Sequence, residues 1–148
     1  MNAHRFRVIY GDTDMMGVVY YANYFRYFEA GRNEFLRAAG LEYRGLEADG
    51  IALPVAEAKA KYLAPARYDD ELLLETWIEE VRHVSVRMAY RLSRETDDTI
   101  LVTGETLHAC VDRRGKLSRF PDELQSKLRA LIDTEDRKVR GDGTQSGA

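Results

Sequence analysis

The chain has 148 residues, of which 45% are hydrophobic and 32% charged, and its formal net charge is -3. This length suits one domain with a single core, and the composition is too apolar for an intrinsically disordered protein. The net charge gives no broad positive field, so nucleic acid is not expected as a principal partner.

The sequence carries no sign of export or membrane insertion. Its first residues lack the apolar stretch of a secretory signal, and no uninterrupted apolar run is long enough to cross a bilayer. Cys110 is the only cysteine, so an internal disulfide is excluded, and the apolar residues around it favour a small core residue. We therefore expect a cytoplasmic protein.

The first predicted elements are a short strand and a long helix. Alternating apolar residues predict a strand from Phe6 to Tyr10, and Gly11-Asp12 then ends the run. Apolar residues at helical spacing predict a helix from Tyr21 to Ala39, which Gly40 closes in the left-handed conformation. An aromatic cluster at the start of this helix is expected to pack mainly into the core: Tyr20, Tyr21, Tyr24, Phe25, Tyr27 and Phe28.

A loop rich in Glu and Gly is followed by four predicted strands: Ile51 to Leu63, Glu71 to His83, Ser85 to Arg94, and Thr99 to Arg113. The third alternates most clearly, with an apolar face for the core and a polar face for water. Short, turn-like separators indicate that consecutive strands pair antiparallel as a meander. Pro54 is expected near a strand start or at a sheet edge.

The last predicted element is a second helix from Pro121 to Ile132, with proline and acids in its first turn. Residues 134–148 are charged and then Gly-rich, so we expect a disordered tail after a single domain of residues 1–133. One strand, one long helix and four antiparallel strands form an α+β layout in which a curved sheet wraps the helix.

Two segments carry a family resemblance. The stretch from Tyr10 to Tyr24, YGDTDMMGVVYYANY, closely resembles the signature of the 4-hydroxybenzoyl-CoA thioesterase family, including its YbgC-type acyl-CoA thioesterases. The stretch from Lys61 to Leu72, KYLAPARYDDEL, resembles the same family, and the likeness runs from about Arg5 to Leu131. It implies a hotdog fold, hydrolysis of a small to medium aliphatic or aromatic acyl-CoA, and a homodimer or homotetramer with sites at subunit interfaces.

The resemblance also implies that Asp14, the second acid of the Asp-x-Asp pair, is catalytic. Thioester cleavage needs an attacking oxygen and stabilisation of the oxyanion that forms. Asp14 could attack directly and form an anhydride, or act as general base on water, and the sequence leaves both open. The backbone N–H of Tyr21 at the helix N-terminus is the first candidate for the oxyanion hole, and Gly17 permits close approach. Coenzyme A is part of the substrate, and no other cofactor or metal is expected.

Structural explanations compete for several of these residues. Loop aspartates are usually turn formers or caps, and we expect that role for Asp12, whereas the signature favours a catalytic Asp14. An Asp-x-Asp metal site is not expected, because no nearby His or Glu completes an oxygen-rich shell. The three histidines, which show no spacing typical of a metal site or triad, are expected to be structural: His4, His83 and His108.

Substrate contacts are predicted less directly. Val19 and Tyr24 are candidates to line the acyl site, and Met15-Met16 stand where many relatives carry smaller residues. Lys59 and Lys61 on one strand face could meet the CoA phosphates, as could a second pair, Arg87 and Arg91. A solvated strand face is the simpler explanation of both pairs.

Three other functions fit parts of the same pattern. A thioesterase acting on acyl groups of acyl carrier protein would favour a basic patch around the pocket mouth. A non-catalytic acyl-CoA binding module would have no need for Asp14. A hotdog dehydratase generally relies on an active-site histidine, which the helix region does not provide.

Overall fold

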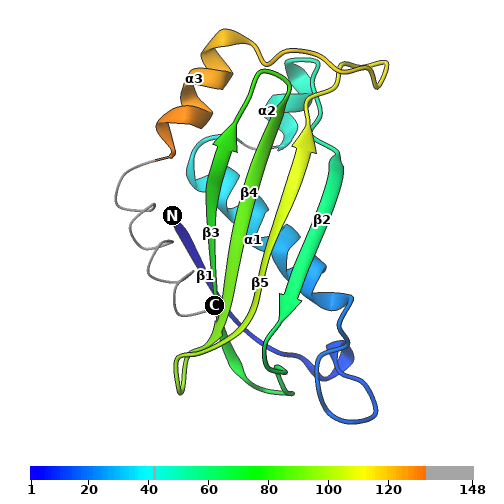
Figure 1. Cartoon of the computed structure of the whole chain (residues 1–148), viewed down its shortest axis with the longest axis vertical. Coiled ribbons are helices and arrows are strands. Elements are labelled where there is room, and N and C mark those ends of the chain that lie inside the picture. Colours follow the sequence, from blue (N-terminus) through cyan, green and yellow to red (C-terminus); the bar gives the residue numbers. More distant parts are fainter. Residues whose placement is uncertain (42, 133–148) are drawn as a thin grey trace.

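A computed structural model describes residues 1–41 and 43–132 of the chain, so the predicted tail at 134–148 lies outside the described residues. A five-stranded antiparallel sheet faces one long helix, α1, which crosses behind it (Figure 1). This confirms the expected α+β layout. The elements, in chain order, are β1 (Asn2–Arg7), the short 3-10 helix η1 (Tyr10–Asp12), α1 (Asn23–Ala38), α2 (Tyr43–Ala48), β2 (Val55–Tyr62), β3 (Glu71–Val81), β4 (Ser85–Arg94), β5 (Thr99–Ala109) and α3 (Asp122–Ala130).

The strand order in the sheet is β1-β3-β4-β5-β2. The predicted meander is confirmed for β3, β4 and β5, but the expectation that consecutive strands pair is wrong for β2 and β3. Because β1 occupies the free edge of β3, ending at the pair Arg7↔Glu71, β2 pairs with β5 at the opposite edge. Residues 65–70 are therefore no hairpin turn, and we call them the crossover turn.

Several predicted boundaries move for physical reasons. The first strand begins at Asn2 and ends at Arg7. Beyond the pair Arg7↔Glu71 the carbonyl of Val8 accepts the N–H of Asp69 (3.0 Å), because the N–H of Asp70 bonds to the carbonyl of Arg67 (3.1 Å). Helix α1 begins two residues later than expected, at Asn23, and α2 occupies part of the predicted loop. The strand predicted from Ile51 to Leu63 is shorter, β2 (Val55–Tyr62). Pro54 directly precedes it on the sheet edge, as predicted.

The core lies between α1 and the inner face of the sheet. Phe28 stacks on Tyr90 with ring centroids 4.4 Å apart. Gly31 lets the helix backbone approach β3 closely, since a Cβ there would lie 2.4 Å from the Leu74 Cδ2. The predicted cap is confirmed: Gly40 has φ +75, and the following N–H of Leu41 bonds back to the carbonyl of Leu36 (2.7 Å).

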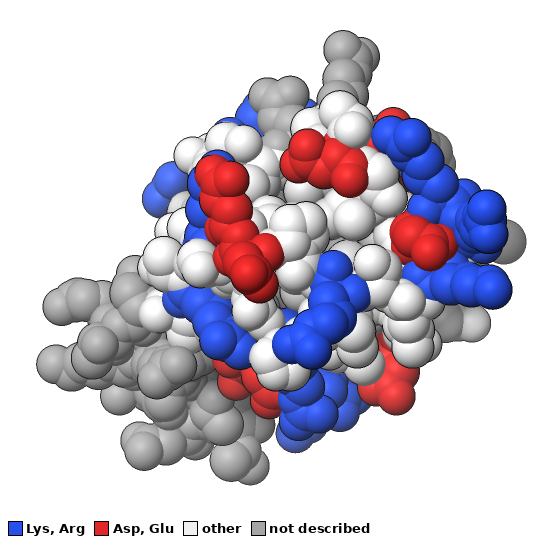
Figure 2. Space-filling view, turned by 90° about the horizontal axis from the view of Figure 1, so that it is seen from above, with Lys and Arg blue, Asp and Glu red and all other residues white. Residues whose placement is uncertain are grey.

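The outer face of the sheet is less solvated than its polar alternation predicted. Arg91 pairs with Glu75 across the strands (2.9 Å), and the guanidinium lies 5.9 Å from the ring centre of Trp77, which is 7% exposed. The long charged side chain of Arg91 thus covers apolar surface on the neighbouring strand. At the end of the molecule that carries α3, acidic and basic side chains interleave over the surface (Figure 2). Among the described residues no helix is long and apolar enough to span a bilayer.

Candidate active site

Residues 13–19 form a tight hairpin between η1 and α1, which we call the site loop. Thr13 pairs with Val19, and the N–H of Asp14 bonds to the carbonyl of Val18 (2.9 Å). The N–H of Gly17 then closes a turn on the carbonyl of Asp14 (3.0 Å), and Gly17 has φ +77. Asp at the first turn position and Gly at the position with positive φ are the residues that such a turn favours.

Asp14 is exposed at the start of this turn. One carboxylate oxygen, Oδ1, accepts the N–H of Met16 (2.8 Å), which is the bond expected of a turn former. Within the described residues its other oxygen has no hydrogen-bond partner, so one oxygen orients the carboxylate while the second faces outward. The geometry therefore accommodates both the structural and the catalytic expectation for Asp14, and the catalytic role stays a prediction.

Asp12 is buried and fastens η1, directly before the site loop, to α1. The Tyr27 hydroxyl donates to its Oδ2 (2.8 Å), and the Asn23 side chain donates to its backbone carbonyl (3.0 Å). Burial, followed by the bond to Asp12, raises the pKa of Tyr27, so its hydroxyl stays a donor. Asp12 thus has the positioning contacts expected of a structural residue.

The N-terminus of α1 points toward the site loop and has no side-chain cap at Ala22. Among residues 1–41 and 43–132, neither the Tyr21 N–H nor the Ala22 N–H bonds to a backbone carbonyl. Unpaired N–H groups at the positive end of a helix bind negative oxygen atoms well. The geometry thus leaves the Tyr21 N–H available, as the predicted oxyanion-hole role requires.

The crossover turn packs against the site loop and is joined to it by hydrogen bonds. Val19 donates its N–H to the carbonyl of Ala66 (2.8 Å), Tyr68 donates to the carbonyl of Gly17 (3.2 Å), and the N–H of Ala66 donates to the Tyr24 hydroxyl (3.1 Å). Val19 and Tyr24 are 4% and 3% exposed. Both therefore hold the loop in place, and their proposed contact with substrate stays a prediction.

The lysines predicted to meet CoA lie on the outer face of β2. Lys59 pairs with Glu105 (2.7 Å), which also pairs with Arg87 (3.3 Å), as the strand-face explanation expects, and its contact with CoA stays a prediction. Lys61 has no ion pair within the described residues. Sequence reasoning missed its neighbour Tyr62, whose hydroxyl donates to the carbonyl of Tyr21 (3.4 Å). No local pattern signals this contact, because 41 residues separate the two tyrosines.

Large apolar side chains are exposed around the site loop, and we call them the apolar rim: Tyr10, Met15, Met16, Tyr20, Tyr21, Tyr62, Leu63 and Tyr68. Met15 and Met16 project fully from the turn, at 105% and 80% exposure. The rings of Tyr10 and Tyr68 meet edge to face, 5.5 Å apart, which joins the rim of the loop to the crossover turn. A patch of this kind marks a ligand-binding or protein-binding surface.

The described residues contain no group of three or more His, Cys, Asp or Glu side chains arranged to hold a metal ion. His108 is buried, with its ring nitrogens bonded to Thr106 (2.7 Å) and to the Leu53 carbonyl (3.0 Å). Cys110 is fully buried, as expected of a small core residue.

Comparisons with known proteins find similarity to thioesterases. A family model described as the thioesterase-like superfamily matches residues 8–128. An acyl-CoA thioester hydrolase, YbgC, of Escherichia coli is 39% identical over 106 residues, covering 72% of this chain and 78% of that protein. An acyl-CoA thioesterase, YbgC, of Haemophilus influenzae is 36% identical over 129 residues, covering 84% and 92%.

A solved structure supports the same relationship. The crystal structure of a hypothetical protein from Thermus thermophilus superposes with a TM-score of 0.83 at 34% identity, covering 89% of this chain and all of that one. The likeness confirms the expected hotdog arrangement of a long central helix wrapped by a five-stranded antiparallel sheet.

Proposed function

We propose that this chain, which belongs to the thioesterase-like superfamily, hydrolyses small to medium aliphatic or aromatic acyl-CoA thioesters. The products are the free carboxylic acid and coenzyme A. The observation that carries the proposal is a carboxylate, Asp14, in a loop beside the uncapped N-terminus of α1.

In the proposed mechanism the thioester carbonyl lies between the Asp14 carboxylate and the N-terminus of α1. Its oxygen accepts the Tyr21 N–H, which stabilises the negative charge as the carbonyl carbon becomes tetrahedral. Asp14 either attacks that carbon and expels the CoA thiolate, leaving an anhydride that water cleaves, or removes a proton from the water that attacks. Both routes use the same carboxylate oxygen, and the bond from the Met16 N–H holds the other.

Replacing Asp14 tests the proposal. Asp14→Asn should lower kcat by several orders of magnitude with the fold intact, because an amide can neither attack nor accept the proton. Turnover is measured by thiol release from a panel of acyl-CoA thioesters, and folding by circular dichroism. Asp112→Asn is the matched control, since Asp112 Oδ1 accepts the N–H of Arg114 (2.8 Å) in an equivalent turn.

The outcomes separate the alternatives. Near-native turnover in Asp14→Asn would show that the Asp14 carboxylate takes no part in the reaction. Turnover confined to acyl groups on acyl carrier protein would favour the carrier-protein thioesterase, and acyl-CoA binding without any turnover would favour a binding module.

We also propose that two copies pair to complete the site. The apolar rim is exposed around Asp14, and the edge strand β2 is exposed at seven of its eight residues, Ala60 being the half-buried one. Exposed strand edges and apolar patches are usually covered by partners, and a two-fold dimer covers both copies at once. Light scattering should give at least twice the 17.0 kDa chain mass. A fully active species of single-chain mass would contradict the pairing.

A further inference from the structure

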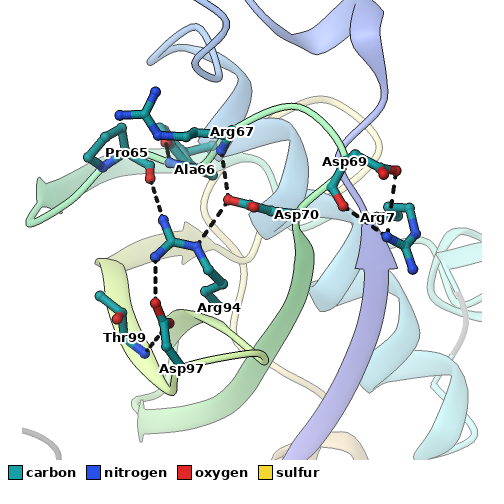
Figure 3. A network of polar contacts seen from close by, with 10 residues as sticks. Arg7, Pro65, Ala66, Arg67, Asp69, Asp70, Arg94, Asp97 and Thr99 are labelled. Atoms are coloured by element: carbon teal, nitrogen blue, oxygen red, sulfur yellow. Dashed lines mark hydrogen bonds and ion pairs between the residues drawn. The ribbon is translucent and has the colours of Figure 1, made fainter.

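The last residue of β4, Arg94, uses its guanidinium group to join the crossover turn to the turn between β4 and β5 (Figure 3). Its Nε donates to Asp70 Oδ2 (3.1 Å), its Nη1 to Asp97 Oδ2 (3.0 Å) and its Nη2 to the carbonyl of Pro65 (3.0 Å). The Arg94 side chain is 19% exposed, so these charge-assisted bonds are partly shielded from water. One cation therefore fixes two carboxylates and one backbone carbonyl.

The bonded groups shape the crossover turn from within. Asp70 Oδ2 also accepts the N–H of Arg67 (2.9 Å), which closes residues 67–70. Arg94 thus reaches the turn at Pro65 and, through Asp70, at Arg67. Arg7 of β1 holds the other side of the turn through the carbonyl of Asp69 (2.9 Å), and it makes no contact with Pro65.

The part that Arg94 holds is the part that pairs with the site loop. Between Pro65 and Arg67 lies Ala66, whose carbonyl accepts the Val19 N–H, and Arg67 itself pairs with Val18. The Val18 carbonyl in turn accepts the N–H of Asp14 (2.9 Å). Hydrogen bonds, together with the short backbone segments between them, therefore join the guanidinium of Arg94 to the backbone of Asp14.

We propose that Arg94 is a positioning residue for thioester hydrolysis, a role that rests on the proposed function. Arg94 fixes the position of the crossover turn relative to the site loop. Through the turn it sets the distance between the Asp14 carboxylate and the Tyr21 N–H. A shift of about 1 Å in a reacting group can cost about a hundredfold in rate. The residue acts on the chemical step, because none of its contacts is with the apolar rim.

Arg94→Met and Arg94→Lys test this role. Arg94→Met removes all three bonds, and Arg94→Lys keeps a cation that cannot present the same planar fork. We expect kcat to fall about tenfold to a hundredfold in Arg94→Met, with KM changed less than about threefold and a partial recovery in Arg94→Lys.

Arg5→Met is the control. Arg5 of β1 pairs with Glu95 (2.6 Å), the residue that follows Arg94, but it has no contact with the crossover turn. This variant loses an ion pair beside Arg94 and should keep the kcat of the parent protein. An equal fall in kcat in Arg5→Met would show a general effect of destabilisation and overturn the proposal.

Amide hydrogen exchange provides a readout that does not depend on turnover. The N–H groups of Val19 and Tyr68, which join the site loop to the crossover turn, should lose protection in Arg94→Met and keep it in Arg5→Met and Asp14→Asn. Unchanged protection of both amides in Arg94→Met would overturn the positioning role, even in a protein that failed every thioesterase assay. Loss of activity in Asp14→Asn with protection retained tests the proposed function separately.

Discussion

Gly17 shows how one residue sets the direction of the site loop. Its φ of +77 is open to glycine and strained for other residues, and a Cβ at this position would meet no atom within 4 Å. A larger residue is therefore disfavoured by backbone conformation alone. Because the carbonyl of Gly17 accepts the Tyr68 N–H, relaxation of φ would also pull the loop from the crossover turn.

Gly17→Ala should lower the free energy of unfolding by about 1 kcal/mol and also lower kcat. Urea denaturation gives the first quantity and the acyl-CoA assay the second. Gly11→Ala is the control, since Gly11 also has open space around it and lacks a positive φ. Equal behaviour of the two variants would mean that the backbone of Gly17 is not under the constraint described.

The site could be predicted from the sequence where its parts are neighbours along the chain. Asp14, Gly17 and Tyr21 lie within eight residues, so the order of strand, turn and helix already places a carboxylate near a helix N-terminus. Tyr62 and Arg94 are brought in by the tertiary fold. The local pattern does not show whether Arg94 or Arg91, three residues earlier, reaches the crossover turn, and only the sheet order reveals it.

Helix α1 and the sheet are matched by residue size rather than by periodicity. A Cβ on Gly31 would lie 2.4 Å from Leu74 Cδ2 and 2.8 Å from Thr76 Oγ1, so either these two side chains or the helix would have to move. Alanine has a higher helix propensity than glycine by about 1 kcal/mol, but the steric cost of overpacking is typically about 1–3 kcal/mol. The steric cost therefore exceeds the gain in helix propensity, and the net effect of the substitution on stability is unfavourable.

Gly31→Ala is thus expected to destabilise the protein by about 1–2 kcal/mol, whereas Gly45→Ala in α2 should stabilise it by up to about 1 kcal/mol. Gly45 has no atom within 4 Å of the position that its Cβ would occupy. Denaturant unfolding of both variants gives the comparison. A stabilising Gly31→Ala would mean that α1 can move off the sheet without cost.

The bounds of an element were predicted best where its own residue pattern was sufficient to define them. Alternation over ten residues gave β4 its observed bounds, Ser85–Arg94. The partner of β2 could not be predicted, because alternation specifies which face is buried and carries no information about the neighbouring strand. The start of α1 was also missed by two residues, since Tyr21 and Ala22 continue the apolar spacing without forming helical bonds.

At the scale of the whole molecule, a directed chain of hydrogen bonds crosses the core from α1 to the segment before β2. Arg32 donates to the Tyr90 hydroxyl (3.1 Å), Tyr90 bonds to Thr106 (2.7 Å), and Thr106 bonds to His108 Nε2 (2.7 Å). His108 Nδ1 then donates to the Leu53 carbonyl (3.0 Å). A guanidinium can only donate and a carbonyl can only accept, so each hydroxyl donates toward His108 and the ring must be neutral.

This chain predicts how stability depends on acid. Burial, reinforced by the charge of Arg32, lowers the pKa of His108 to about 4 from its ordinary value of 6.5. The unfolded chain therefore takes up a proton as the pH falls below about 6.5, whereas the folded protein does so only near pH 4. The contribution of His108 to stability is complete above pH 6.5, falls through this window, and loses about 3 kcal/mol in total.

His108→Gln isolates this contribution, because glutamine can donate to Leu53 and accept from Thr106 without titrating. Urea denaturation at intervals from pH 8 to pH 4 should show the free energy of unfolding of the parent protein falling more steeply below pH 6.5 than that of the variant. Above pH 6.5 the two curves should stay a constant distance apart, since neither state of His108 then binds the proton, and this range serves as the internal control. Curves that remain parallel down to pH 4 would show that the folded and unfolded states protonate His108 alike, which a neutral ring at the end of this chain does not permit.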